Sequence, residues 1–206
     1  MSAAAMTGRE TLPERRERLE HYLRLLRKWQ KSINLVSPNT LDNAWQRHVE
    51  DSLQLADLIP PGAIIFDLGS GAGFPGLVLA MVRPDLDVTL IESDTKKCTF
   101  LSTVSRETKT PVKIENQRIE SVSRETIPAI VIARALASLD KLCGYCLPWA
   151  QANPDLMILL LKGRKAREEI AQARQNYSFD VQVISSRTDA EGCIVQLSNL
   201  ATDSGG

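Results

Sequence analysis

The chain has 206 residues, of which 43% are hydrophobic and 24% are charged. That composition excludes wholesale disorder and supplies a core for one domain with an extension. Lysine and arginine number 25, as do aspartate and glutamate, which excludes attachment to nucleic acid by bulk charge alone, so any basic surface must be local.

Residues 1–9 lack the apolar core of a signal peptide. The most apolar stretch, residues 62–82, contains Asp67 and repeated glycines, so it does not suit a membrane span. Four cysteines at this length are too few for a disulfide scaffold. We therefore expect a cytoplasmic protein without contact with a membrane.

The first sixty residues are predicted to form a helical extension. Apolar residues recur at three-to-four spacing over residues 19–33, the period of an amphipathic helix, and Pro13 suits its first turn. A second helix is expected from about Leu41 to Leu58, ended by the Pro-Pro-Gly at 60–62. We assign residues 1–60 to the extension, 61–200 to the main domain and 201–206 to a tail.

After Gly62, β-rich runs alternate with helical stretches. Strands are predicted at 63–67, 87–92, 112–116, 129–133 and 156–161, and helices near 75–83, 94–108, 138–150 and 165–175. The last two strands, 180–185 and 192–197, have no room between them for a crossover helix and should form an antiparallel hairpin. The pattern predicts an α/β fold with a mostly parallel, seven-stranded sheet.

The densest motif is the glycine loop that directly follows the first strand, Asp67-Leu-Gly69-Ser70-Gly71-Ala-Gly73-Phe74-Pro-Gly76. Its glycines allow a ligand to approach the backbone and permit a sharp turn from strand to helix. The helix that starts near Pro75 offers N–H groups to a carboxylate or phosphate. Glu92 ends the second strand, where an acidic side chain can hold ribose hydroxyls.

Two cofactors fit this loop. Residues 71–76 read G-x-G-x-x-G, as in NAD(P) sites, whereas the whole string reads Asp-x-Gly-x-Gly-x-Gly, as in S-adenosylmethionine (SAM) methyltransferases. SAM is favoured because Asp67 would repel a pyrophosphate, because no second domain is evident, and because the hairpin matches the seventh strand of class I methyltransferases. NAD(P) and a purely structural glycine turn remain alternatives.

Further motifs occur in order along the chain: Asn34-Leu-Val-Ser37, Arg47-His48-Val-Glu-Asp51-Ser, Lys96-Lys97, Phe100-Leu101, Arg118-Ile-Glu120, Arg134-Ala-Leu-Ala-Ser-Leu139 and Leu161-Lys-Gly163. With the Phe-Pro-Gly ending of the glycine loop, residues 15–200 resemble the bacterial ribosomal RNA small-subunit methyltransferase G family, also called GidB. The resemblance implies a class I, Rossmann-like enzyme that methylates N7 of a guanine in 16S rRNA near the decoding site. Its cofactor would be SAM, and its partner 16S rRNA or the small ribosomal subunit.

The resemblance also suggests roles for single residues. Gly69 and Phe74 match positions that contact SAM, Glu92 matches the ribose position, the pair Ile119 and Glu120 matches the adenine position, and Arg134 matches an arginine of the cofactor site. Together with the loop, the predicted cofactor-binding residues are Asp67, Gly69, Ser70, Gly71, Gly73, Phe74, Glu92, Ile119, Glu120 and Arg134. Pro128-Ala129 departs from the pattern, because many relatives carry an acidic residue there.

The predicted chemistry needs alignment rather than acid–base groups. Guanine N7 carries a free lone pair and no proton, and a sulfonium is already a good leaving group. What remains is to hold the reacting atoms in line and exclude water. We therefore nominate no catalytic acid or base and no metal, and we name Arg118 and Arg134 as positioning candidates.

Two clusters of cations are candidates for RNA contact. Seven cations accompany three glutamates over residues 14–31, a pattern equally typical of a solvated helix face. Lys162, Arg164, Lys165 and Arg167 follow the fifth strand, near the end of the sheet where ligands bind. We predict that Lys162, Arg164 and Lys165 bind RNA, and that the protein is a monomer.

For two further motifs we favour a structural role over a catalytic one. Cys143-Gly-Tyr-Cys146 has redox spacing, but within a helix it is better read as two buried thiols. His48 and Asp51, three apart on one helical face, suggest acid–base work, yet a packing pair that orders the extension over the cofactor is preferred. Methylation of another RNA or a small molecule, and SAM or RNA binding without catalysis, stay open as alternative functions.

Overall fold

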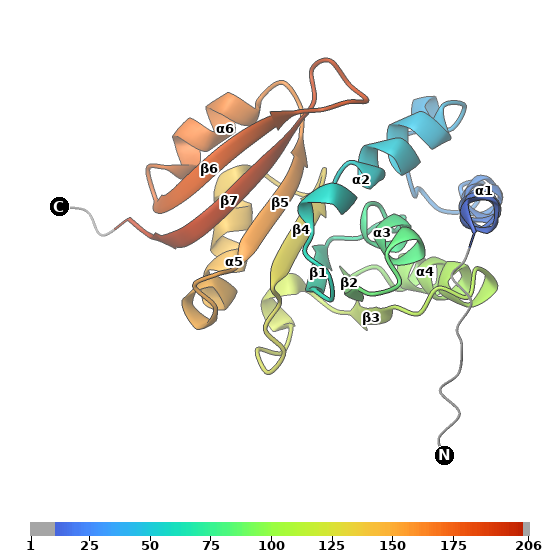
Figure 1. Cartoon of the computed structure of the whole chain (residues 1–206), viewed down its shortest axis with the longest axis horizontal. Coiled ribbons are helices and arrows are strands. Elements are labelled where there is room, and N and C mark those ends of the chain that lie inside the picture. Colours follow the sequence, from blue (N-terminus) through green and yellow to red (C-terminus); the bar gives the residue numbers. More distant parts are fainter. Residues whose placement is uncertain (1–10, 204–206) are drawn as a thin grey trace.

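The computed structural model describes residues 11–203 and shows one seven-stranded sheet in the order β3-β2-β1-β4-β5-β7-β6 (Figure 1). The expectations for the first nine residues and for Ser204–Gly206 therefore lie outside the described residues. The strands are β1 (Ile64–Leu68), β2 (Asp87–Glu92), β3 (Lys113–Asn116), β4 (Ile130–Arg134), β5 (Met157–Lys162), β6 (Tyr177–Ser185) and β7 (Cys193–Thr202). No helix in the described part of the chain is long and apolar enough to cross a membrane.

Strands β1 to β5 pair in parallel, and β7 inserts antiparallel between β5 and β6. The predicted mostly parallel sheet with a terminal hairpin is thus confirmed. The hairpin is longer than expected, because β6 begins at Tyr177 and β7 continues to Thr202. Of the added residues, Phe179 and Leu200 are buried, whereas Ser178, Asn199 and Thr202 are exposed and polar and interrupt the hydrophobic pattern.

Helices cover both faces of the sheet (Figure 1). One face carries α1 (Leu12–Trp29), α3 (Gly76–Val82) and α4 (Thr95–Glu107), and the other carries α5 (Leu139–Ala152) and α6 (Ala166–Ala173). Two hydrophobic clusters fill the space between helices and sheet, and alternate strand residues enter one or the other: Ile65 and Ile132 lie in the first, Phe66 and Val131 in the second. Because both faces are covered, the central strands are almost wholly buried.

Helix α1 begins with a capping box in which Thr11 and Glu14 bond each other's backbone N–H groups, with Pro13 in the first turn. Its apolar stripe, which includes Tyr22 and Leu26, joins the same core as the sheet. Arg18 strengthens the docking by donating to the carbonyl oxygens of Met81, at 2.6 Å, and Thr108. The predicted first helix is confirmed, although it ends at Trp29 rather than near residue 33.

The second helix predicted for residues 41–58 is present but shorter and irregular. η2 (Trp45–Glu50) continues directly into α2 (Asp51–Leu53), and the single turns η1 (Pro38–Thr40) and η3 (Ala56–Leu58) flank them. The widest of them, η2, is a π-helical turn, a form that often occurs at functional sites because it reorients side chains. This turn carries His48, and Asp51 follows it directly.

Candidate active site

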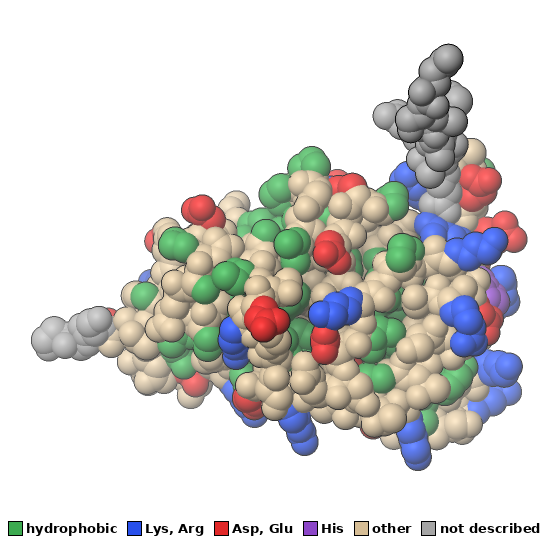
Figure 2. Space-filling view, turned by 90° about the horizontal axis from the view of Figure 1, so that it is seen from below, with side chains coloured by type: hydrophobic (Ala, Val, Ile, Leu, Met, Phe, Trp, Pro, Cys, Tyr) green, Lys and Arg blue, Asp and Glu red, His purple; other side chains and the backbone are tan. Residues whose placement is uncertain are grey.

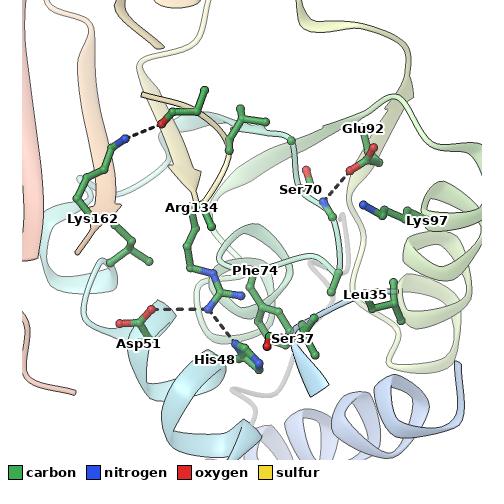
Figure 3. A pocket seen from close by; sticks show the side chains of 18 of the residues that line it. Leu35, Ser37, His48, Asp51, Ser70, Phe74, Glu92, Lys97, Arg134 and Lys162 are labelled. Atoms are coloured by element: carbon green, nitrogen blue, oxygen red, sulfur yellow. Dashed lines mark hydrogen bonds and ion pairs between the residues drawn. The ribbon is translucent and has the colours of Figure 1, made fainter. Parts of the chain in front are cut away.

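A cavity of about 1250 Å³ opens at the carboxyl ends of the parallel strands. Its walls come from four places that are far apart in sequence: the segment that follows α1, the glycine loop, the ends of the inner strands with η4 (Ile119–Ser121), and the loop between β6 and β7. Figure 3 shows side chains from the first three places, and Lys97 of the following helix (Thr95–Glu107), turned toward one space; Glu92 and Lys97 lie on one side, and Arg134 and Lys162 on the other.

The glycine loop is held in shape by backbone bonds and by Glu92. Gly69 has φ +62, and a Cβ there would lie 2.4 Å from Leu136, so the position requires glycine. The N–H of Gly71 donates to Glu92 Oε2 at 2.9 Å, and that of Asp94 donates to Oε1 at 2.8 Å. A carboxylate has about four acceptor sites, so Glu92 can still accept from two hydroxyls in the cavity.

Two predicted cofactor residues lie behind the loop rather than on the cavity wall. Asp67 is fully buried, and its Oδ2 accepts from the N–H of Gly76 at 3.0 Å. Burial raises the pKa of this carboxyl to about 7. A Cβ on Gly73 would lie 2.5 Å from Leu77 and 2.9 Å from the Tyr22 hydroxyl. Asp67 and Gly73 therefore support the loop, and the other eight predicted cofactor residues line the cavity.

Arg134 is the centre of a polar cluster on the cavity wall. Its Nη1 donates to the carbonyl of Arg47 at 3.1 Å and to His48 Nδ1 at 2.9 Å, and lies 3.7 Å from Asp51 Oδ2. The guanidinium carbon lies 5.1 Å from the centre of the Phe74 ring. These hydrogen bonds use Nη1, and the guanidinium is largely buried away from water. Its other N–H groups can therefore donate to an anion in the cavity.

His48 must accept this bond, because a guanidinium only donates. Burial, with the charges of Arg134 and Arg47, lowers the pKa of His48 to about 4, which keeps the imidazole neutral. The other ring nitrogen then donates to Thr40 Oγ1 at 2.9 Å. The structure thus supports the packing interpretation of His48 and Asp51, with the addition that both fix Arg134.

Phe74 connects this cluster to the extension. Its ring stacks on Tyr22 and on His48, each at 4.9 Å between ring centres, and the Phe74–Pro75 peptide bond is cis. The Tyr22 hydroxyl donates to the Ala72 carbonyl. Sequence reasoning missed Tyr22, because in the sequence it is one more apolar-stripe residue of an amphipathic helix.

The predicted basic residues divide into paired and exposed ones. Lys162 Nζ donates to the Ala137 carbonyl and to Glu169 Oε2, both at 2.7 Å, so its charge is neutralised within the protein. Arg164 and Lys165 are exposed beside the cavity, and Arg164 Nε lies 3.9 Å from Glu191 Oε2 in an exposed ion pair. Arg118 is also exposed, and it lines the cavity with Ile119 and Glu120.

The loop between β6 and β7 was missed as a part of the site. Asp51 Oδ1 accepts from Thr188 Oγ1 at 2.9 Å and from Gln54 Nε2 at 2.8 Å. Gln54 also accepts from the backbone N–H of Arg187, and Arg47 pairs with Asp189 at 2.8 Å. In the sequence the Ser-Arg-Thr-Asp run at 186–189 resembles an ordinary polar turn, and nothing in it reveals partners more than 130 residues away.

The thiols of Cys143 and Cys146 are buried within α5. Burial raises the pKa of Cys143 to about 12 and raises that of Cys146 as well. A reactive C-x-x-C pair requires a lowered pKa, so the interpretation as buried thiols is supported. Among residues 11–203 no three His, Cys, Asp or Glu side chains are grouped as metal ligands would be.

Residues 15–193 match the model of the family GidB, described as rRNA small subunit methyltransferase G. The chain is 46% identical over 188 residues to a ribosomal RNA small subunit methyltransferase G from Gluconobacter oxydans, covering 91% of this chain and 95% of that protein. It is 43% identical over 204 residues to the protein of the same name from Parvibaculum lavamentivorans, covering 97% and 88%.

Solved structures with a similar fold are more distant in sequence. A TehB-like SAM-dependent methyltransferase from Corynebacterium glutamicum matches with a TM-score of 0.57 and 12% identity, covering 88% of this chain and 99% of that one. A precorrin-6y methyltransferase from Geobacter metallireducens matches with a TM-score of 0.51 and 11% identity, covering 81% and 91%. At these identities the likeness establishes the fold, which is the class I methyltransferase fold predicted from the sequence.

Proposed function

The chain belongs to the rRNA small subunit methyltransferase G family, and we propose that the cavity described above is the site where it methylates N7 of a guanine in 16S rRNA. It is a SAM-dependent rRNA methyltransferase by this membership. The observation that carries the placement is the convergence of Glu92, the glycine loop and Arg134 on one cavity. Its volume exceeds that typical for one small ligand, which leaves room for a cofactor and a base together.

The residues present fit SAM. Gly69 and Gly71 lack side chains where the backbone borders the cavity, Glu92 offers acceptors for ribose hydroxyls, and Ile119 and Glu120 border the place for an adenine. Arg134 has donors for the carboxylate of the amino-acid part. When bound, SAM supplies a methyl group on a positively charged sulfur.

The role of the protein in the reaction is to orient the reactants and exclude water. Guanine N7 attacks with its own lone pair, so no side chain has to remove a proton, and we propose that the reaction needs no metal. His48 stays neutral beside Arg134 and holds the guanidinium in one orientation. The aromatic ring of Phe74, buried between Tyr22 and His48, forms a rigid apolar floor for the cavity.

We further propose how the parts of the chain divide the work. Residues 61–200 hold the cofactor, and the extension up to residue 60 builds the side of the cavity that receives the base, through residues such as Asn34 and Ser37. Arg118, Arg164 and Lys165 are exposed near the opening, and we assign them to RNA phosphates. Acting on 16S rRNA or the small subunit near the decoding site, the protein would work as a monomer in the cytoplasm.

The test is methyl transfer in vitro. Purified protein is incubated with SAM carrying a labelled methyl group and with small ribosomal subunits from a strain that lacks the gene, and the labelled nucleoside is identified by mass spectrometry. Label in 7-methylguanosine from 16S rRNA supports the proposal. Label in another nucleoside, or none while SAM still binds, overturns the assigned acceptor.

A further inference from the structure

The basic charge of α1 is concentrated in its second half. Residues 12–21 contain three arginines and three glutamates, whereas residues 22–31 contain Arg24, Arg27, Lys28 and Lys31 and no acidic residue. All four of these cations are exposed. We call them the α1 basic stripe. Because Arg24, Arg27 and Lys28 are spaced three and four apart, they lie on one side of the helix, and Lys31 follows two residues after its end.

The cations of the first half, by contrast, already have structural partners. Arg18 donates to the backbone carbonyls of Met81 and Thr108, and Arg16 pairs with Glu20 at 2.9 Å. In the stripe, Arg24 only contacts His21, and within residues 11–203 no ion pair joins Arg27, Lys28 or Lys31 to an acidic group. Cationic side chains that form no ion pair within the protein can bind an external anion.

The stripe leads directly to the cavity. Asn34, three residues after Lys31, is the first of the cavity residues in this segment, and Gln30 fixes the segment by bonding both the N–H and the carbonyl of Val36. Trp29 packs edge-on against Phe100 of α4, with 5.7 Å between ring centres. One helical turn before Phe100, Lys97 points into the cavity and takes part in no ion pair with any described residue (Figure 3).

The stripe thus ends three residues before the first cavity residue of its segment, and Lys97 lies on α4, which packs against α1. Figure 2 shows lysine and arginine side chains along the right edge of the molecule, the end that carries α1 and α4 in Figure 1. Because the net charge of the whole chain is zero, this local excess of positive charge indicates a specific anion-binding surface. The four cations are spread over eight residues, about 10 Å at the rise of a helix, which is enough to meet more than one phosphate of a nucleic-acid strand.

We propose that the α1 basic stripe, with Lys97 at its cavity end, binds the phosphate backbone of the rRNA that flanks the target guanine. The proposal rests on the proposed function, since it names the surface by which that substrate is held. The stripe contributes binding of the substrate and takes no part in methyl transfer itself. Its loss raises KM for the RNA particle, leaves kcat unchanged, and reduces the dependence of binding on salt.

The experiment compares two double variants that remove equal charge. Lys28→Gln with Lys31→Gln removes half of the stripe. Lys113→Gln with Arg174→Gln removes two exposed cations from β3 and from the end of α6, neither of which lines the cavity. For each protein we would measure KM and kcat for gene-deleted small subunits at several KCl concentrations, and the Kd for SAM.

We expect the stripe variant to raise KM about fivefold and to lower the slope of log KM against log salt by about 1.4, since each phosphate contact contributes about 0.7 on a single strand. Its kcat and its Kd for SAM should equal those of the wild type. Equal effects in both double variants, or a stripe variant with unchanged KM and salt slope, overturn the proposal. Failure of the wild type to methylate the subunits would instead refute the proposed function.

Discussion

Arg134 donates from Nη1 to Nδ1 of His48 at 2.9 Å, a bond that exists only while the imidazole is neutral. The surroundings guarantee that state, because burial and the two neighbouring arginines lower the pKa of His48 to about 4. The cluster is thus set for an environment near neutrality, where the guanidinium is charged and its histidine partner is not. Four predictions follow from this cluster, from the glycine loop beside it and from the hydrogen bonds by which Gln54 holds the loop between β6 and β7.

Replacing Arg134 by lysine should damage cofactor binding more than folding. A lysine is a point charge on a flexible stem and does not reproduce the planar fork that contacts Arg47, His48 and Asp51 together. We expect Arg134→Lys to weaken the Kd for SAM about tenfold and to lower the free energy of unfolding by about 1–2 kcal/mol.

Arg83→Lys is the matched control for this change. Arg83 also donates to backbone carbonyls, those of Ala56 and Ile59, but it does not line the cavity. Its replacement should cost similar stability and leave the Kd for SAM unchanged, as measured by calorimetry and urea unfolding. Parallel losses of SAM affinity in both variants would show that Arg134 acts only through the fold.

His48 and Asp67 should give opposite dependences of stability on pH. Between pH 4 and 6.5 the unfolded state protonates His48 and the folded state does not, so the contribution of His48 to stability rises with pH. Between about pH 4 and 7 the folded state holds a proton on Asp67 that the unfolded state has lost, so the contribution of Asp67 falls with pH. In the wild type the two contributions largely cancel.

Single variants should separate them. Relative to the wild type, His48→Gln should become less stable as pH rises from 4 to 6.5, and Asp67→Asn should become more stable, each by at most about 1.4 kcal/mol per pH unit. Urea denaturation at pH 4.5, 5.5 and 6.5 gives both slopes. Differences from the wild type that stay constant over this range would disprove both pKa assignments.

A methyl group at Gly69 should abolish cofactor binding. Alanine at φ +62 is strained by about 1–2 kcal/mol, and its Cβ would meet Leu136 at 2.4 Å in the wall of the cavity. Gly62 has a similar φ, +70, with nothing within 4 Å. Gly62→Ala should therefore lose about 1 kcal/mol of stability and keep full SAM affinity. The account is contradicted if the two variants bind SAM equally well.

Loss of Gln54 should release the loop between β6 and β7. The buried amide holds Asp51, Ser186 and the backbone N–H of Arg187, and leaving such partners unbonded costs about 1–3 kcal/mol. In Gln54→Ala, trypsin should cut after Arg187 about tenfold faster, since each 1.4 kcal/mol of local stability is tenfold in opening. Asn153→Ala, which removes a part-buried hydrogen bond to the Pro128 carbonyl at the end of α5, should not change that rate.

The sequence predicted the features that local pattern controls. The strand alternation and the glycine loop follow from hydrophobic period and backbone freedom, and the structure confirms the sheet and the position of the loop. The pattern did not reveal that Asp67 faces the N–H of Gly76, or that Gly73 makes room for Tyr22. The motif identifies the residues of the loop, but tertiary packing determines which of their side chains line the cavity and which lie behind it.

The unpredicted parts depend on contacts between distant segments. The π-helical turn around His48 widens a helical stretch whose apolar spacing suits an ordinary α-helix. The hydrogen bond from the Arg187 N–H to Gln54 Oε1 joins residues 133 apart. The basic run that contains Lys162 predicts an RNA contact, but Glu169 in the first turn of α6 pairs with this lysine at 2.7 Å. Single-residue patterns carry no information on such pairs.

The central claim is that this cavity transfers a methyl group to one guanine of 16S rRNA, and cells test it most directly. A strain lacking the gene would be complemented with the wild type, Gly62→Ala or Gly69→Ala, and its 16S rRNA fragments analysed by mass spectrometry. The account predicts 7-methylguanosine at a single position near the decoding site with the first two proteins and none with Gly69→Ala. The same modification restored by Gly69→Ala at equal protein level would contradict it.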